Sequence, residues 1–216
     1  MFEAKDVDLR SWTNHDILDY NAGSFNMSGD VARIEFYNKV LSTDESKQNY
    51  FGSNIVTDGM LFNLDANNII SYPKSGTTWY NLSGSASDIT LYNGIAFDKG
   101  DGGSLDFDQT NDYADGTLNY TDTGGEFTVT GWIKPENPAY DTNTYQSIVN
   151  RTDGNHIFSL FLTTPTYTPS KPVGSLASWI FDTGGAIRQF NSTLTTVSDE
   201  WNYCVWKWQD GIGYTY

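Results

Sequence analysis

The sequence predicts an all-β protein, an antiparallel two-sheet jelly-roll sandwich with very little helix. Three observations lead to this prediction. Short stretches that alternate apolar and polar residues recur along the chain, and turns rich in Gly, Asn and Asp separate them. The acidic residues are 21 Asp against 6 Glu, and Asp favours turns whereas Glu favours helices. Amphipathic-helix spacing is scarce, and short strands at near-regular intervals are typical of sandwiches and jelly rolls.

The predicted elements follow one another closely along the chain. They are a strand at 30–38, a helix of one or two turns at 43–50, and strands at 104–108, 126–134, 156–162 and 201–208. Ser42 is the expected cap of the helix. In the strand after Glu126, the side chains of Phe127, Val129 and Ile133 share one face. Pro135 ends that strand because it has no N–H group to donate.

The charge of the chain excludes two classes of partner. The net charge is −15 at pH 7, so the phosphates of a nucleic acid would be repelled and no nucleic-acid partner is expected. An anionic membrane surface is disfavoured for the same reason. No apolar run approaches the roughly 20 residues of a membrane-spanning helix, so no membrane insertion is expected.

Cysteine and histidine are too scarce for a disulfide framework or a zinc site. Cys204 is the single cysteine and cannot form an internal disulfide. It shares one side of its predicted strand with Trp206 and Trp208, and we expect an inert core thiol. The two histidines, His15 and His156, stand far apart in the sequence, which does not favour zinc.

The carboxylates do not form a hydrolase pattern. Glycoside hydrolysis needs two carboxylates that face one cleft, which within a strand means alternate positions. Asp106 and Asp108 alternate without a Glu, while Asp199 and Glu200 are adjacent and would face opposite ways. No Gly-x-Ser-x-Gly nucleophile motif occurs. We therefore expect no catalytic residues and no enzymatic activity.

The chain divides near residue 52 into two unequal parts. Residues 1–52 end in a strand and the short helix, residues 53–58 form a connector, and a longer β segment occupies 59–216. Residues 211–216 stop where another strand should begin, so we expect the sandwich of 59–216 to be incomplete at its C-terminal end. Two arrangements remain open. Residues 1–52 either finish a preceding domain of a tandem array or supply the missing strands of one sandwich in permuted order.

Several motifs in a fixed order carry a resemblance to a known family. They lie at 64–67, 71–84, 91–94, 102–113, 127–135 and 201–211. Together they resemble the laminin G-like, concanavalin A-like β-sandwich superfamily, in the form found in structural and adhesive proteins of bacteriophages and environmental bacteria. The likeness is dense over 60–135 and loose over 136–216. Residues 28–50 look like the closing strand and terminal helix of such a domain, and Gln109 stands where the family usually has Gly.

The resemblance implies a non-catalytic structural module of a virus particle, such as a capsid decoration, fibre or tail-associated protein located in the virion. Its partners would be other structural subunits in an oligomer, and host surface glycans held weakly. The alternative is a carbohydrate-binding or adhesion module of a bacterial or phage surface protein, located outside the cell or at its surface. A glycoside hydrolase is the third alternative, which the carboxylate pattern does not favour.

The resemblance also implies a calcium ion near a rim of the sandwich. Its candidate ligands are Asp65, Asp108, Asn111 and Asp112, because calcium takes six to eight hard oxygens from carboxylates, amides and carbonyls. The alternative is that Asn111 and Asp112 form an Asx turn and the other aspartates are solvated. Calcium is the one cofactor that we expect.

Three tyrosines are the candidate contacts with glycans or partner proteins. Tyr140, Tyr145 and Tyr167 lie in stretches rich in Thr, Pro and Asn, which favours exposed rings. Aromatic rings stack on the C–H faces of sugars and also anchor protein interfaces. The alternative for each of them is ordinary packing.

Overall fold

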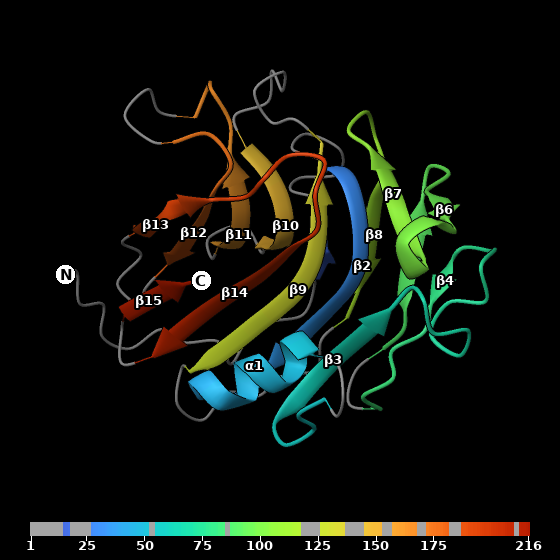
Figure 1. Ribbon diagram of the computed structural model, residues 1–216, viewed down its shortest axis with the longest axis horizontal. Helices are drawn as coiled ribbons and strands as arrows, with labels where there is room; N and C mark the ends of the chain where they lie inside the picture. Colours follow the sequence, from blue (N-terminus) through green and yellow to red (C-terminus); the bar gives the residue numbers. More distant parts are fainter. Residues whose placement is uncertain are drawn as a thin grey trace.

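The computed structural model describes residues 15–17, 27–51, 55–84, 87–117, 126–136, 145–152, 157–167, 172–181, 187–209 and 212–216. These residues form two antiparallel β-sheets packed as a sandwich, with one α-helix on the outside (Figure 1). The predicted all-β, two-sheet antiparallel fold is therefore confirmed. No helix in the described part of the chain is long and apolar enough to cross a membrane.

The first sheet has eight strands. Their spatial order is β13 (Ile187–Thr195), β12 (Ser175–Phe181), β11 (Ile157–Thr163), β10 (Tyr145–Thr152), β1 (His15–Ile17), β8 (Tyr113–Gly116), β5 (Ile89–Tyr92) and β4 (Thr78–Trp79). All of the pairings that join these strands are antiparallel.

The second sheet has seven strands. Its order is β15 (Ile212–Thr215), β14 (Asn202–Gln209), β9 (Phe127–Pro135), β2 (Ser28–Tyr37), β7 (Ser104–Asp108) and β6 (Ala96–Asp98), and β3 (Met60–Asp65) also pairs with β2. A short 3-10 helix, η1 (Gly100–Gly102), precedes β7. Along one edge of β2, β7 pairs with its first residues and β3 with its last.

The elements expected from the sequence overlap those observed. The predicted strands at 30–38, 104–108, 126–134, 156–162 and 201–208 correspond to β2, β7, β9, β11 and β14, and the predicted helix corresponds to α1 (Thr43–Phe51). The helix begins with a reciprocal cap. The Ser42 hydroxyl accepts the Glu45 N–H at 3.2 Å, and the Glu45 carboxylate accepts the Ser42 N–H at 2.8 Å.

Strand β2 occupies an interior position in the seven-stranded sheet, between β9 and β7. Residues 28–37 and the later strands therefore share one sandwich. Of the predicted connector at 53–58, residues 55–58 are described, and Ile55 and Val56 pack against Tyr37 of β2 and Met60 of β3. The chain that leads from α1 to β3 is thus held against the sheet at this point.

The main core lies between the two sheets. Cys204, Trp206 and Trp208 of β14 face it together, as the alternation of that strand predicted. Trp79 and Phe107 are also fully buried in it. Burial raises the pKa of the Cys204 thiol far above its ordinary value, so the thiol stays protonated and unreactive.

Candidate functional site

The outward face of the seven-stranded sheet carries rows of side chains that run across its strands. Residues directly opposite one another on paired strands project to the same side. The three rows are Arg33–Trp132–Tyr203, then Glu35–Thr130–Val205–Tyr216, and then Tyr37–Thr128–Lys207–Tyr214. Figure 1 shows α1 lying across β2 and β9 on this face. The helix therefore covers the residues of β2 and β9, while those of β14 and β15 lie beside it.

Helix α1 is fixed to the sheet by a buried amide. The Asn49 side chain is fully buried, and its Nδ2 donates to the Tyr37 hydroxyl at 2.8 Å. Its Oδ1 accepts the Val56 N–H at 3.0 Å, and the Tyr37 hydroxyl donates to the Val56 carbonyl at 3.1 Å. Arg33 Nη2 donates to the Asn49 carbonyl at 2.6 Å. These bonds hold the helix, the sheet and the segment after the helix in one arrangement.

A buried carboxylate lies beneath the helix. Glu35 has no exposed surface, forms an ion pair with Arg33 (Oε1 to Nε, 2.7 Å) and accepts a hydrogen bond from the Thr130 hydroxyl. Burial raises the pKa of Glu35 to about 7, although the Arg33 charge and the Thr130 hydrogen bond act in the opposite direction. The support of α1 thus includes a group that titrates near neutral pH.

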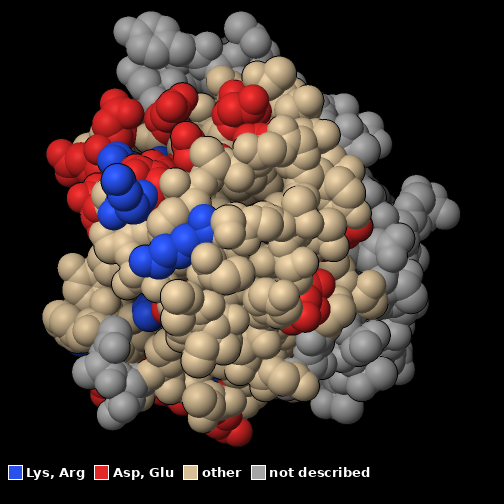
Figure 2. Space-filling view, turned by 90° about the vertical axis from the view of Figure 1, so that its right-hand side faces the viewer, with Lys and Arg blue, Asp and Glu red and all other residues tan. Residues whose placement is uncertain are grey.

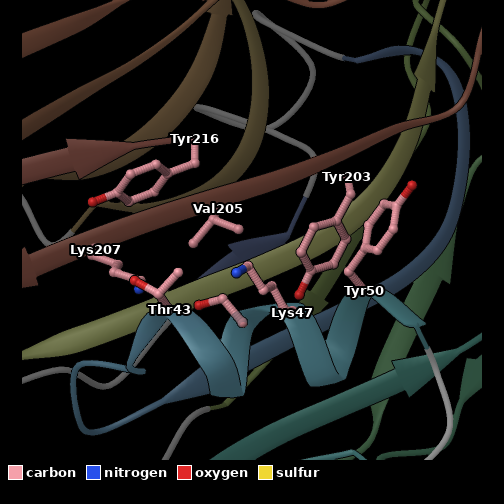
Figure 3. Close-up of a pocket in the computed structure, with 8 residues that line it drawn as sticks. Thr43, Lys47, Tyr50, Tyr203, Val205, Lys207 and Tyr216 are labelled. Carbon is pink, nitrogen blue, oxygen red and sulfur yellow. The ribbon is translucent and has the colours of Figure 1, made fainter.

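The part of the outward face beside α1 forms a hollow that we call the tyrosine groove (Figure 3). It has a volume of about 210 Å³ and is lined by Thr43, Ser46, Lys47, Tyr50, Tyr203, Val205, Lys207 and Tyr216. Figure 3 shows Lys207 and Tyr216 toward one end, Tyr50 and Tyr203 toward the other, and Lys47 between them. A second hollow of about 450 Å³, the polar hollow, adjoins it and shares Thr43, Lys207 and Tyr216. It also takes in Glu45, Glu126, Gln209 and Tyr214.

Two rings of the groove, Tyr50 and Tyr216, are exposed, and Tyr203 is half-buried. Tyr50 stacks on Trp132 at 5.2 Å between centroids, and Tyr203 meets Tyr50 edge-on at 5.5 Å. Tyr216 is 59% exposed and Tyr50 is 45% exposed. Tyr216 exchanges two backbone hydrogen bonds of 3.0 Å with Val205, which extends the β14–β15 ladder to the end of the given sequence. Ring faces on a rigid sheet and helix are therefore available to a ligand.

Lys207 is the most deeply buried cation of the groove. Its side chain lies under the ring of Tyr216, with Nζ 5.4 Å from the ring centroid, and Nζ donates a hydrogen bond to the Leu41 carbonyl. The residue is 6% exposed, and burial lowers the pKa of its ammonium group, while the Glu45 charge acts in the opposite direction. The groove therefore presents aromatic faces around an ammonium group withdrawn from water.

The carboxylates expected to bind calcium do not all come together. Asp108 is paired with Ser28 and Asp65 with Arg33 along the same edge of β2, so the two lie five strand residues apart, about 16 Å. The expectation that Asp65 joins the other three is wrong. Its Oδ1 instead accepts the N–H groups of Asn67 and Asn68 at 3.0 and 3.2 Å.

Asp108, Asn111 and Asp112 do lie in one turn, between β7 and β8. Asp108 Oδ1 accepts the N–H groups of Thr110 and Asn111 at 2.8 and 3.3 Å, so an Asx turn is present, but Asp108 forms it and not Asn111 and Asp112. Asp112 Oδ2 accepts the Asp108 N–H at 3.1 Å, and burial raises the pKa of the Asp112 carboxyl. Gln109 has a φ of 62°, in the left-handed region that favours Gly. Within the described residues no three His, Cys, Asp or Glu side chains form a metal-holding group, and calcium at this turn stays a prediction.

The tyrosines proposed as exposed contacts are placed differently from the expectation. Tyr140 lies outside the described residues. Tyr145 and Tyr167 are 2% and 9% exposed, so the expectation of exposed rings is wrong for both. They belong to a buried aromatic cluster that we define as Tyr145, Phe161, Tyr167 and Trp179. The turn after β11 brings Tyr167 back over Phe161, at 5.3 Å, and its hydroxyl accepts a 3.0 Å hydrogen bond from Trp179 Nε1.

The tyrosines of the groove were not among the predicted contacts. One indication was available in the sequence. Once Cys204, Trp206 and Trp208 are placed inward, alternation places Tyr203, Val205 and Lys207 outward. The sequence does not indicate that α1 and Tyr216 would flank this outward row.

Acidic side chains gather at the other end of the same sheet. Figure 2 shows them on the side of the molecule where β6 and β7 lie. We define the acidic patch as Asp30, Asp98, Asp106 and Glu136. Asp30 and Asp106 face each other across β2 and β7. Burial raises the pKa of both carboxyls, and the neighbouring acidic groups act in the same direction, whereas the Ser104 hydrogen bond and the Lys134 charge oppose the shift of Asp30. The sheet thus carries its acidic patch and its tyrosine groove at opposite ends.

Comparisons of the chain with protein-family models, with curated proteins and with solved structures find no significant match.

Proposed function

We propose that this chain is a non-catalytic carbohydrate-binding module and that the tyrosine groove is its binding site. The observation that carries the proposal is the placement of Tyr50, Tyr203 and Tyr216 around one hollow. Sugars present C–H faces that stack on aromatic rings, and hydroxyl groups that exchange hydrogen bonds. The surface of this hollow is almost wholly apolar, which suits ring stacking, and the polar hollow that adjoins it supplies the hydrogen-bonding groups.

The scaffold of the groove favours binding because its rings are ordered before any ligand arrives. Tyr203 is part of a strand paired on both sides, and Tyr50 lies on a helix anchored through Asn49. Tyr50 is also held between Trp132 and Tyr203. Rings that are already fixed lose little conformational entropy on binding, so more of the stacking energy appears as affinity.

The chemistry of the hollows favours binding over hydrolysis. The lining of the tyrosine groove contains no carboxylate, whereas glycoside hydrolysis uses two. In the adjoining polar hollow, Glu45 is bound by the Ser42 N–H and by Lys39. These contacts lower the pKa of Glu45, which is opposite to the raised pKa that a general acid requires.

The resemblance described above favours a virus particle as the place where the module works, as a capsid decoration, fibre or tail-associated protein. A bacterial or phage surface adhesin would use the same groove. Contacts with neighbouring structural subunits belong to the same proposal. In the described residues β15 and β6 end the seven-stranded sheet, and a strand at such an end can accept a further strand.

Binding to a panel of soluble oligosaccharides, measured by calorimetry and by tryptophan fluorescence, tests the proposal. The panel contains gluco-, manno-, chito- and lacto-oligosaccharides together with uronate oligomers. We expect saturable binding that Tyr216→Ala weakens by roughly tenfold or more, because one stacking face is lost. Tyr80→Ala is the matched control, since Tyr80 is 43% exposed and lies outside the groove. A folded chain that binds no member, or equal binding by the Tyr216 variant, contradicts the proposal.

A further inference from the structure

The tyrosine groove differs in charge from the rest of the chain. The whole sequence contains 27 acidic residues against 12 Lys and Arg, yet the eight residues that line the groove include two lysines and no carboxylate. The acidic patch lies at the opposite end of the sheet. Two lysines at the border of an apolar aromatic surface favour an anionic ligand, because complementary charges set specificity, and Glu45 and Glu126 line only the adjoining polar hollow.

Lys207 is a buried cation whose charge is not neutralised by an ion pair. Among the described residues no carboxylate lies within 4.0 Å of its Nζ, and the contacts of that atom are the Leu41 carbonyl and the Tyr216 ring. An ammonium group has three N–H donors, and a single carbonyl uses one. A buried charge without a close counter-ion is costly, and the more distant Glu45 offsets this cost only in part. An anion that reached Nζ would supply a close charge partner.

Lys47 supplies a second cation from the opposite wall. Its side chain comes from α1, is exposed, and lies between Lys207 and the pair Tyr50 and Tyr203 (Figure 3). Among the described residues it forms no ion pair, whereas Lys39 on the far side of the polar hollow is bound by Glu45 and Asp58. Two cations that do not have anionic partners therefore border the same aromatic surface.

We propose that the ligand of the tyrosine groove is an acidic sugar, a uronate-type residue whose carboxylate pairs with Lys207 and Lys47 while its ring stacks on the tyrosines. This inference rests on the proposed carbohydrate-binding function and adds the chemical class of the sugar. An acidic sugar matches both features of the groove, since one face of its ring is apolar and its carboxylate is a charged acceptor.

The titration behaviour of Lys207 agrees with this geometry. Burial lowers the pKa of its ammonium group, and the Glu45 charge compensates the lost hydration only in part. A bound carboxylate would raise that pKa again, so the protonated lysine and the anionic ligand stabilise each other.

Matched pairs of oligosaccharides test the inference. Oligogalacturonate, oligomannuronate, hyaluronan oligomers and sialyllactose are each compared with a partner whose carboxylates are methyl-esterified or reduced. We expect the chain to prefer the acidic member of at least one pair by roughly 10- to 100-fold, the usual value of a charge-assisted hydrogen bond. Lys207→Met and Lys47→Met should each remove most of that preference, and Lys207→Arg should keep it. Lys99→Met, outside both hollows, is the control that should change nothing.

The outcomes separate this inference from the function on which it rests. If neutral and acidic partners bind equally, or if Lys47→Met leaves the preference intact, the acidic-sugar inference is overturned while carbohydrate binding stands. If no sugar binds to the folded chain, both are overturned. Lys47 is exposed, so its variant keeps the test decisive even where replacing the buried Lys207 disturbs folding.

Discussion

The two aromatic clusters of this molecule use the same residue types in opposite ways. The tyrosine groove and the buried aromatic cluster lie on the outward sides of different sheets. In the groove, Tyr50 and Tyr216 remain 45% and 59% exposed. In the buried cluster, Phe161 is fully buried and Tyr167 is only 9% exposed.

The difference between the clusters arises from what covers each outward face. On the seven-stranded sheet α1 covers β2 and β9, and the groove lies between α1 and the neighbouring β14, with Tyr216 at its border. On the eight-stranded sheet the turn after β11 returns Tyr167 to the face of its own sheet, where its hydroxyl accepts a hydrogen bond from Trp179. An aromatic side chain that faces outward from a strand is therefore available to a ligand in the tyrosine groove, whereas in the buried aromatic cluster it is part of a core.

The largest expected effect is on the stability of the buried cluster. Phe161→Ala should lower the free energy of unfolding by about 3–5 kcal/mol, because a fully buried ring leaves a cavity that its neighbours fill only in part. Tyr216→Ala, at an exposed ring of the groove, should lower it by less than about 1 kcal/mol. Urea unfolding followed by tryptophan fluorescence measures both. Equal losses would show that the two clusters do not differ as the structure describes.

The sequence predicts the strands and the helix better than it predicts which segments cover the outward faces of the sheets. The strand predicted at 126–134 from local alternation is observed at 127–135, and the helix predicted after Ser42 is observed as α1. The prediction that Tyr145 and Tyr167 are exposed is wrong, because polar neighbours in the sequence do not show that a turn folds back over the sheet.

The candidate sites were harder to predict because they depend on pairing between distant strands. Asp65 and Asp108 are separated because β3 and β7 occupy successive parts of one edge of β2. The contact of Tyr50 with Trp132 and Tyr203 requires the docking of α1 on strands far along the chain. The outward row of Tyr203, Val205 and Lys207 follows from local alternation, but the hollow around it does not.

The two outward faces also differ in their response to pH, because the described residues beneath α1 include a carboxyl, that of Glu35, whose pKa lies near 7. The pKa of Glu35 is raised from 4.5 to about 7 in the folded chain. The folded state therefore holds a proton that the unfolded state releases above its own pKa, so the Glu35 contribution is fully present below about pH 4.5 and is lost as pH rises through about 7. The corresponding loss in the free energy of unfolding is about 3 kcal/mol.

Glu35→Gln provides the measurement, since glutamine cannot titrate. The free energy of unfolding should fall between about pH 4.5 and 7 in the wild-type chain, and this fall should be about 3 kcal/mol smaller in the variant. The other carboxyls with raised pKa, such as Asp30 and Asp106, are present in both proteins and cancel in the difference. Phe161→Ala has no titrating group at the changed position and should keep the wild-type slope. Parallel pH profiles for wild type and Glu35→Gln would contradict the role assigned to this carboxyl.

The smallest expected effects come from removing a single hydroxyl in each cluster. Tyr167→Phe deletes the acceptor of the Trp179 Nε1–H group, a bond of 3.0 Å in a largely buried setting, and should cost about 1 kcal/mol of unfolding free energy. Tyr216→Phe deletes a hydroxyl from a ring that is 59% exposed and should change that free energy by less than about 0.5 kcal/mol. Because the phenylalanine ring still stacks, sugar binding should fall less in Tyr216→Phe than in Tyr216→Ala. A larger loss of stability from Tyr216→Phe than from Tyr167→Phe would reverse the assignment of the structural and the ligand-facing cluster.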